Sequence, residues 1–411
     1  MRSLSKISLA ILAVGFLVVA GSAFAQDSAK PQMTITGDID SAFGQYSFDK
    51  TSGSSTPAAN QKAFSEFVTS WESNIRFTWS SDALDAIVRY RFRASNEGSG
   101  GSGNAAANAT SVLQSGSADA ASANDAYHEV WWKSGAFKLG LGKFQGQGWS
   151  QPLSGTYVLI NPIEIAAGAS EYWMNWTGIS GLDAEYNVGA VQVGLAISSQ
   201  CKPSCGNAVS NNTIARSEVN TSSMVPHLTG KFGDIAIRAQ LPITAGTIQN
   251  SGAVTTATPP ASADPIKGTG IDATSTKSVS GSGFQAGVQW ASGGLKVALD
   301  VSSFTDTKVA EINGSTAKDR SRAGTALRVD VPAGPGSVII GYFTQDDNNF
   351  SDTTVSSSIM TLRYAIPTGF GSIIPEFRSA TTGKAIAATS TTGAADATNS
   401  EFRLMFQAPI L

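Results

Sequence analysis

Several stretches of the chain place their charged residues at alternate positions and apolar residues between them, which is the pattern of a β-strand with one polar and one apolar face. Within residues 84–95, the odd positions hold Asp85 and three arginines, whereas the even positions are apolar. Residues 320–331 and 401–407 show the same separation. Because a helix would mix these residues on one surface, the pattern predicts an all-β protein whose charges share one face of the sheet.

Short turns and long polar stretches follow one another along the chain. The short turns contain glycine or aspartate and fall at residues 80–83, 134–136, 188–190, 232–234, 292–294, 332–336 and 367–371. The longer polar stretches fall at residues 47–65, 96–124, 144–177, 200–221, 245–280, 306–319, 346–353 and 380–398. Seven turns between eight loops require sixteen strands, with both chain ends on the side of the turns. This asymmetry predicts a transmembrane antiparallel β-barrel with short periplasmic turns and long external loops.

The sixth strand can be placed in two ways. Apolar residues are even-numbered before Gly189 and odd-numbered after Ala190, and this change of parity favours a strand at Gly178–Val188 followed by a turn. The alternative starts the strand earlier, in Tyr172–Trp176, and makes residues 181–199 one bulged strand. Both placements keep the strand number even.

Composition excludes other classes of protein. Apolar residues make up 41% of the chain and charged residues only 14%, so that the chain is not a charge-rich disordered protein. After residue 25 it has no apolar run of about 18 residues, the length that a transmembrane helix requires. The remainder, residues 26–411, carries 26 basic and 31 acidic residues, because residues 1–25 contain Arg2 and Lys6 and no acid. The resulting net charge of −5 argues against a nucleic-acid partner.

The first 25 residues have the features of a secretory signal peptide. Arg2 and Lys6 precede a 14-residue apolar core, and Ala23-Phe24-Ala25 forms a small-residue cleavage site. We therefore expect an exported chain with a single barrel domain at residues 26–411. Export also favours a disulfide between Cys201 and Cys205, and two cysteines alone do not complete a zinc site.

The inward faces of the predicted strands carry most of the charge. By parity, eleven of the twelve arginines after residue 25 face inward: Arg76, Arg89, Arg91, Arg93, Arg238, Arg320, Arg322, Arg328, Arg363, Arg378 and Arg403. Inward acids include Asp183, Glu185 and Asp300. Buried charge has to be paired or hydrated, so we expect a water-filled interior and hence a channel.

Three segments resemble the general bacterial porins of Gram-negative outer membranes. These segments are residues 33–40, residues 73–88 and the hairpin at residues 125–143, and the match after residue 145 is one of architecture. The chain lacks the family's Pro-Glu-Phe-Gly-Gly loop signature, has Lys143 in place of an arginine and does not end in phenylalanine. The resemblance implies a homotrimer in the outer membrane, in contact with lipid and lipopolysaccharide.

The resemblance also implies a constriction of the pore. The third loop, at residues 144–177, is expected to fold inward and to face a basic wall. Carried over by position, the basic wall consists of Arg76, Arg89, Arg91, Arg93 and Lys143, and the loop acids are Glu164 and Glu171. Loop aromatics such as Trp149 either fix the loop to the wall or form a sugar-stacking surface.

These features predict passive diffusion of small hydrophilic solutes and ions. One alternative is a specific channel for anions such as phosphate or carboxylates, because the arginines at positions 89, 91 and 93 could bind them. The second alternative is an enzyme with a barrel fold. His128 and His227 are the only imidazoles, and we expect both to be interfacial residues with satisfied hydrogen bonds and no catalytic role. No cofactor is expected, although Asp346-Asp347-Asn348-Asn349 and Asp352 offer oxygen ligands for Ca²⁺.

Overall fold

The computed structural model describes the strands, the short turns and part of the third loop. The described residues are 32–49, 64–95, 127–143, 149, 152–155, 180–198, 219–249, 276–307, 319–347, 355–382 and 397–410. Within these ranges no helix is both long and apolar enough to cross a membrane. The predicted signal peptide, the two cysteines and Asp352 fall outside the described residues and stay predictions.

Every regular element of the described chain is a β-strand. The strands are β1 Gln32–Asp49, β2 Phe64–Ser80, β3 Leu84–Ser95, β4 Tyr127–Ser134, β5 Phe137–Lys143, β6 Ser180–Val188, β7 Val191–Ser198, β8 Val219–Phe232, β9 Ile235–Gln240, β10 Ile243–Gln249, β11 Thr276–Ser292, β12 Leu295–Thr307, β13 Arg320–Ala333, β14 Gly336–Asp347, β15 Val355–Thr368, β16 Gly371–Thr382 and β17 Ala397–Ile410.

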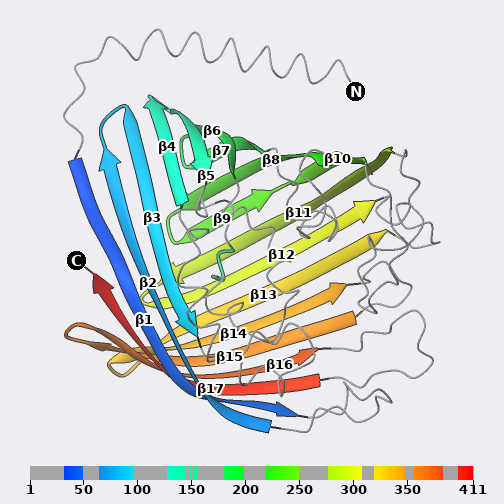
Figure 1. Cartoon of the computed structure of the whole chain (residues 1–411). Coiled ribbons are helices and arrows are strands. Elements are labelled where there is room, and N and C mark those ends of the chain that lie inside the picture. Colours follow the sequence, from blue (N-terminus) through cyan, green and yellow to red (C-terminus); the bar gives the residue numbers. More distant parts are fainter. Residues whose placement is uncertain are drawn as a thin grey trace, which may run out of the picture.

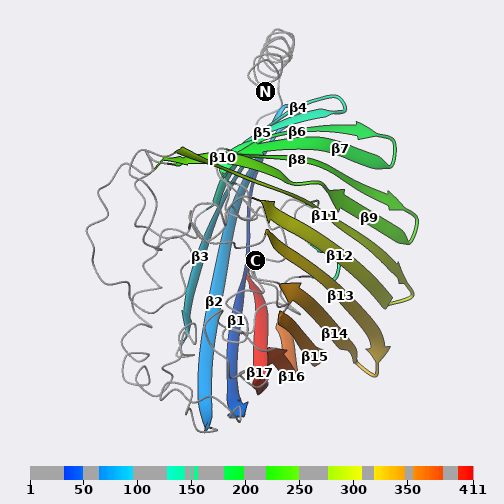
Figure 2. The same cartoon turned by 90° about the vertical axis from the view of Figure 1, so that its right-hand side faces the viewer.

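The strands form one closed antiparallel barrel. Each strand except β9 and β10, which do not pair with each other, hydrogen-bonds to its neighbours in the sequence. β1 also pairs with β17, which leaves the sheet without a free edge. Both views show β17 beside β1 (Figures 1 and 2). Because β9 and β10 each pair with β8 and β11, they are two halves of one strand, and the barrel has sixteen strands. The predicted fold class is confirmed.

Two prolines on adjacent strands explain the break between β9 and β10. Pro242 has no amide hydrogen and cannot donate to the ladder. Its carbonyl accepts a 3.1 Å bond from the amide of Gly283 on β11, and the amide of Leu241 donates a 2.9 Å bond to the carbonyl of Pro226 on β8. Hydrogen bonding therefore continues across the break, although the regular strand geometry does not. The sequence analysis did not predict this break.

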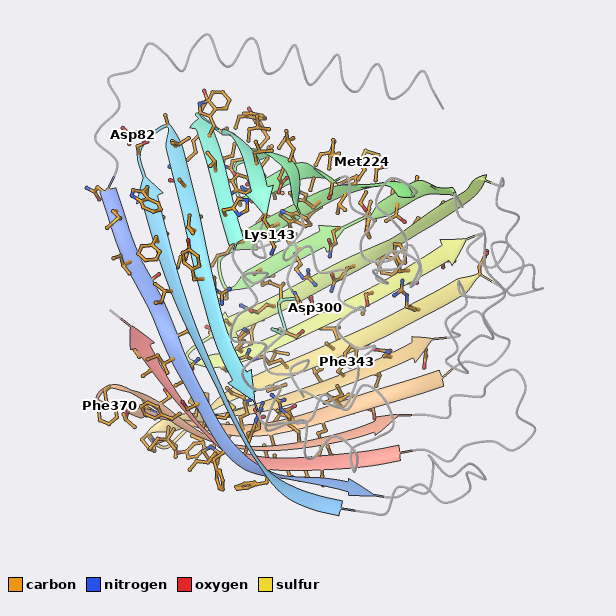
Figure 3. All side chains as sticks on the ribbon, viewed as in Figure 1. Asp82, Lys143, Met224, Asp300, Phe343 and Phe370 are labelled. Atoms are coloured by element: carbon orange, nitrogen blue, oxygen red, sulfur yellow. The ribbon has the colours of Figure 1, made fainter. Side chains whose placement is uncertain are left out.

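The short turns all lie where the sequence predicts them. Each of the seven predicted turns joins two consecutive strands. Asp82 and Phe370, labelled in Figure 3, lie in the turns β2–β3 and β15–β16 at the left of the view. The turn at Gly189 separates β6, Ser180–Val188, from β7, which confirms the predicted end of the sixth strand at Val188. The alternative of one bulged strand at residues 181–199 is wrong.

The two faces of the barrel differ in chemistry. Outward side chains are large, apolar and exposed: Leu141 on β5 is 64% exposed and Leu404 on β17 is 50% exposed. Inward side chains at alternate positions include buried charges, among them Asp183 and Asp300 at 0% exposure. An apolar outer belt around a charged interior is the arrangement of a barrel embedded in a lipid bilayer.

Candidate functional site

Trp149, from the third long loop, is anchored on the inner wall of the barrel. Its indole is almost fully buried, at 1% exposure. The indole N–H donates a 3.0 Å hydrogen bond to Oδ2 of Asp183 on β6. The indole also stacks on the imidazole of His227 on β8, with ring centroids 4.2 Å apart and planes inclined by 14°. Of the two roles considered for this aromatic residue, the geometry supports the fixing of the loop to the wall.

His227 reaches Asp183 by lying across the strand between them. Its Nε2 is 2.9 Å from Oδ1 of Asp183, and both side chains are buried. Gly194 of β7 lies underneath, where an added Cβ would come within 2.3 Å of the imidazole. A glycine at this position therefore allows the histidine to lie flat and to join β8 with β6.

A second contact fixes residues 152–155 to the wall. The amides of Leu153 and Ser154 donate bonds of 3.1 and 2.7 Å to the carboxylate of Asp300 on β12. Arg238 on β9 donates from Nε to the same carboxylate at 2.9 Å and from Nη1 to the carbonyl of Trp149 at 3.0 Å. One buried ion pair thus holds both described parts of the loop. We call Trp149 and residues 152–155 the loop anchor.

Arg328 of β13 lies at the end of the loop anchor. It forms two bonds with the carboxylate of Asp330, of 2.6 and 2.8 Å. Its Nη1 also lies 3.5 Å from the carbonyl of Ser154. The loop anchor therefore contacts strands from β6 to β13, and the expectation that the third loop folds into the barrel is confirmed for its described residues.

Arginines gather on strands around β1. Arg76 and Arg89 face each other across β2 and β3 in the register. On β15, β16 and β17, three arginines form ion pairs with the single carboxylate of Glu376: Arg378 at 2.5 Å, Arg403 at 2.7 Å, and Arg363. We call these five residues, Arg76, Arg89, Arg363, Arg378 and Arg403, the arginine wall.

The arginine wall and the loop anchor lie on opposite sides of the ring. When β9 and β10 are counted as one strand, β12 is eight places from β3 in the ring of sixteen, and β9 is eight places from β1. Asp300 and Arg238 of β12 and β9 hold the loop anchor. Figure 3 labels Asp300 in the middle of β12. A solute in the lumen would therefore pass between the anchored loop and an arginine-rich wall.

The residues expected at the constriction are described to different extents. Arg76 and Arg89 lie side by side, as given above. Arg91 and Arg93 continue the alternation of Arg89 along β3, and their side chains lie outside the described part. Lys143 ends β5, where its register partners are His128 and Ser180. Glu164 and Glu171 lie outside the described residues, so that their role in the constriction stays a prediction.

His227 differs from its sequence-based expectation. We expected an interfacial histidine, but the side chain is buried inside the barrel, on the same face of β8 as Ser223 and Val225. The alternation along β8 carried this signal, and the partner Asp183 was already assigned to the inward face. His128, in contrast, is exposed at the position next to inward-facing Glu129.

The arrangement of His227 and Asp183 is that of a histidine oriented by an acid, which is two thirds of a catalytic triad. Within the described residues, however, the imidazole hydrogen-bonds only Asp183 and stacks on Trp149. No described serine, threonine or cysteine hydrogen-bonds the imidazole.

Solved structures with a similar fold are bacterial porins. The anion-selective porin of Comamonas acidovorans superposes with a TM-score of 0.52 at 11% identity, over 93% of this chain and all of that chain. OprB of Pseudomonas putida, in its high-pH structure, gives a TM-score of 0.52 at 12% identity, over 92% of this chain and 94% of that chain. No protein-family model and no curated protein matches the sequence. The chain has the fold of bacterial porins, and its apolar belt makes it an outer-membrane β-barrel protein.

Proposed function

We propose that the protein is a water-filled outer-membrane channel for the passive diffusion of small hydrophilic solutes and ions. The observation that supports this proposal best is the charged interior of the barrel between the loop anchor and the arginine wall. Charges such as those of Arg76, which is exposed on the inward face, are stable there only with partners or water. Sixteen strands enclose a lumen wide enough for water, and the anchored part of the third loop lies inside it.

The two sides of the proposed channel carry different chemistry. The arginine wall supplies fixed positive charge, and we assign Glu164 and Glu171 of the third loop to the opposite side. Opposed charges create a transverse field that orders water and favours polar solutes over apolar ones. The channel therefore needs no catalytic group and no cofactor.

We further propose a homotrimer that is exported by residues 1–25 and surrounded by lipid and lipopolysaccharide. The apolar outer belt supports contact with lipid, because large exposed apolar residues such as Leu141 and Leu404 are more stable in lipid than in water. Chemical cross-linking of the purified protein tests the trimer, and mass measurement of the mature chain tests cleavage after Ala25.

The decisive experiment is conductance in a planar lipid bilayer. The refolded protein should produce ohmic current steps, and a trimer should produce them in groups of three. The control is the same protein without the refolding step. Circular dichroism verifies that this control is unfolded. If correctly folded protein gives no conductance, the proposed channel is refuted.

Selective passage of anions such as phosphate or carboxylates is the second candidate function. Three arginines form ion pairs with the carboxylate of Glu376, which brings several guanidinium groups, the preferred partners of phosphate and carboxylates, to this part of the wall. The reversal potential in a salt gradient measures this selectivity. Arg89→Gln and Arg91→Gln should shift it toward cations, whereas Lys231→Gln at the turn end of β8 should leave it unchanged. An identical reversal potential in all variants would remove Arg89 and Arg91 from the selective part of the pore.

A further inference from the structure

Asp183, Glu185 and His227 form a compact cluster on the inner wall. Their ligand atoms, one from each residue, all lie within 4.8 Å of one another, and all three residues are buried. Asp183 and Glu185 are two positions apart on β6 and share its inward face. His227 joins them from β8 across Gly194. The cluster brings one imidazole and two carboxylates to a single point of the wall.

Among the described side chains, Glu185 has a cationic neighbour but no hydrogen-bond partner that explains its burial. The residue is 5% exposed, and no hydrogen bond or ion pair joins its carboxylate to another described side chain. The acids Asp183 and Glu129 add negative charge around it, and Lys138 on β5 is its cationic neighbour. A buried carboxylate without a hydrogen bond is costly, and a second acid beside it increases the cost. A bound cation would remove this cost.

Trp149 prepares Asp183 for such a cation. Its indole N–H occupies Oδ2 of Asp183, so that only Oδ1 is directed toward Nε2 of His227. A hydrogen bond that fixes the orientation of a ligand is the usual support around a protein metal site. The stacked indole also covers the imidazole and limits its contact with water.

We propose that Asp183, Glu185 and His227 bind one divalent transition-metal ion. We use Zn²⁺ as the representative ion of this class. An imidazole nitrogen favours Zn²⁺ and related ions over Ca²⁺ and Mg²⁺, which prefer oxygen ligands alone. Zinc bonds to nitrogen and oxygen are about 2.0–2.2 Å long, which places tetrahedral ligand atoms roughly 3.3 Å apart. Oδ1 of Asp183 and Nε2 of His227, which are 2.9 Å apart, would separate slightly, and the carboxylate of Glu185 would move closer to them. The side chain of Glu185, which no hydrogen bond joins to another described side chain, can make this movement. The site goes beyond the proposed channel function, and binding at it does not depend on conduction.

The ion would couple the loop anchor to the wall. Trp149 contacts two of the three ligands, Asp183 and His227. An ion bound by both side chains would hold them in place and would thereby fix the position of the indole. Metal binding should therefore raise the resistance of the folded protein to unfolding, because the ion binds the folded state and not the unfolded chain.

Isothermal titration of the refolded full-length protein with Zn²⁺ tests the proposal. The wild type should bind one Zn²⁺ per chain. Loss of a partner that only orients a ligand already weakens metal sites roughly 10–100-fold, so Glu185→Gln and His227→Ala should each weaken binding at least tenfold. His128→Ala, which removes the other histidine of the chain, should bind as the wild type does. The double variant Cys201→Ser and Cys205→Ser should also bind normally.

The variants give a clear result in either direction. Glu185→Gln preserves the size of the side chain, and circular dichroism of each variant reports whether the barrel has folded. Absence of saturable Zn²⁺ binding to the folded wild type would overturn the proposal. So would retained binding in folded Glu185→Gln and His227→Ala, or loss of binding in the cysteine variant, which would assign the ion to the thiols.

Discussion

Arg238 and Asp300 form a buried ion pair although they lie on strands that are not neighbours. Arg238 is on β9 and Asp300 on β12, and the two side chains meet over Gly287 of β11, with Nη2 and Oδ1 2.8 Å apart. An added Cβ at Gly287 would lie 2.1 Å from Oδ1 of Asp300 and 3.2 Å from Nε of Arg238. The ion pair that holds the loop anchor thus depends on the absence of a side chain at one position.

The substitution Gly287→Ala tests this dependence. The methyl group should displace the carboxylate of Asp300 and lower the free energy of unfolding by about 1–3 kcal/mol, the usual cost of overpacking. Urea unfolding of the refolded barrel measures the change. Gly369→Ala is the matched control, since a Cβ there meets no atom within 4 Å. Equal stability of the two variants would show that Asp300 can move without loss.

Asp300→Asn keeps the shape of the side chain and removes its charge. Arg238, which is 2% exposed, would lose the ion pair, and breaking a buried pair costs about 3–5 kcal/mol of stability. The measurement is again the free energy of unfolding. Asp82→Asn, in the exposed turn between β2 and β3, should change it by no more than about 0.5 kcal/mol. A small effect at both positions would contradict a stabilising role for the pair.

Trp149→Phe retains an aromatic ring over His227 and removes the hydrogen bond to Asp183. Hydrogen bonds to charged groups contribute about 1.5–3 kcal/mol, so we expect the loop anchor to detach more often. In a planar bilayer this should appear as additional current fluctuations between conductance levels. Trp290→Phe, at an outward position of β11 that is 40% exposed, should give wild-type traces. Quiet traces from both variants would argue against a role of Trp149 in fixing the pore.

Leu141→Arg tests the outward face of the barrel. Leu141 is exposed on β5, and an arginine facing lipid near the midplane costs about 2–4 kcal/mol. The variant should fold into lipid vesicles with correspondingly lower stability. Gln192→Arg, at an inward position of β7 whose register partners are Asn187 and Thr229, should be tolerated because its charge stays in water. The opposite order of the two variants would reverse the assignment of the faces.

The sequence was sufficient to predict the strands, the turns and the two faces. Alternation along residues 84–95 is a local property, and so is the change of parity at Gly189, which located the boundary between β6 and β7. The position of Pro242 was visible too, but a proline within a strand can end it or merely interrupt it. Only the pairing of both halves with β8 and β11 distinguishes these outcomes.

The site itself could be predicted only in part. Parity assigned Asp183, Arg238 and Asp300 to the interior, but it does not say which of them meet. His227 contacts Asp183 because Gly194 lies between them, and this relation joins three strands and depends on the register of each. The positions of Trp149 and Ser154 depend on strand registers as well, because their bonding partners Asp183 and Asp300 are 34 and 146 residues away in the chain.

Large side chains that lie flat on the wall affect the width of the lumen. Trp131 lies across Gly140, His227 across Gly194, and Arg238 with Asp300 across Gly287. Each of these glycines lets a bulky neighbouring side chain lie against the inner surface of the sheet, so that the side chain does not extend toward the centre of the barrel. The open cross-section at each level thus depends on how glycines are distributed over the inner surface, as well as on the number of strands. Exchange of one such glycine would alter the calibre of the passage while the architecture of the barrel stays the same.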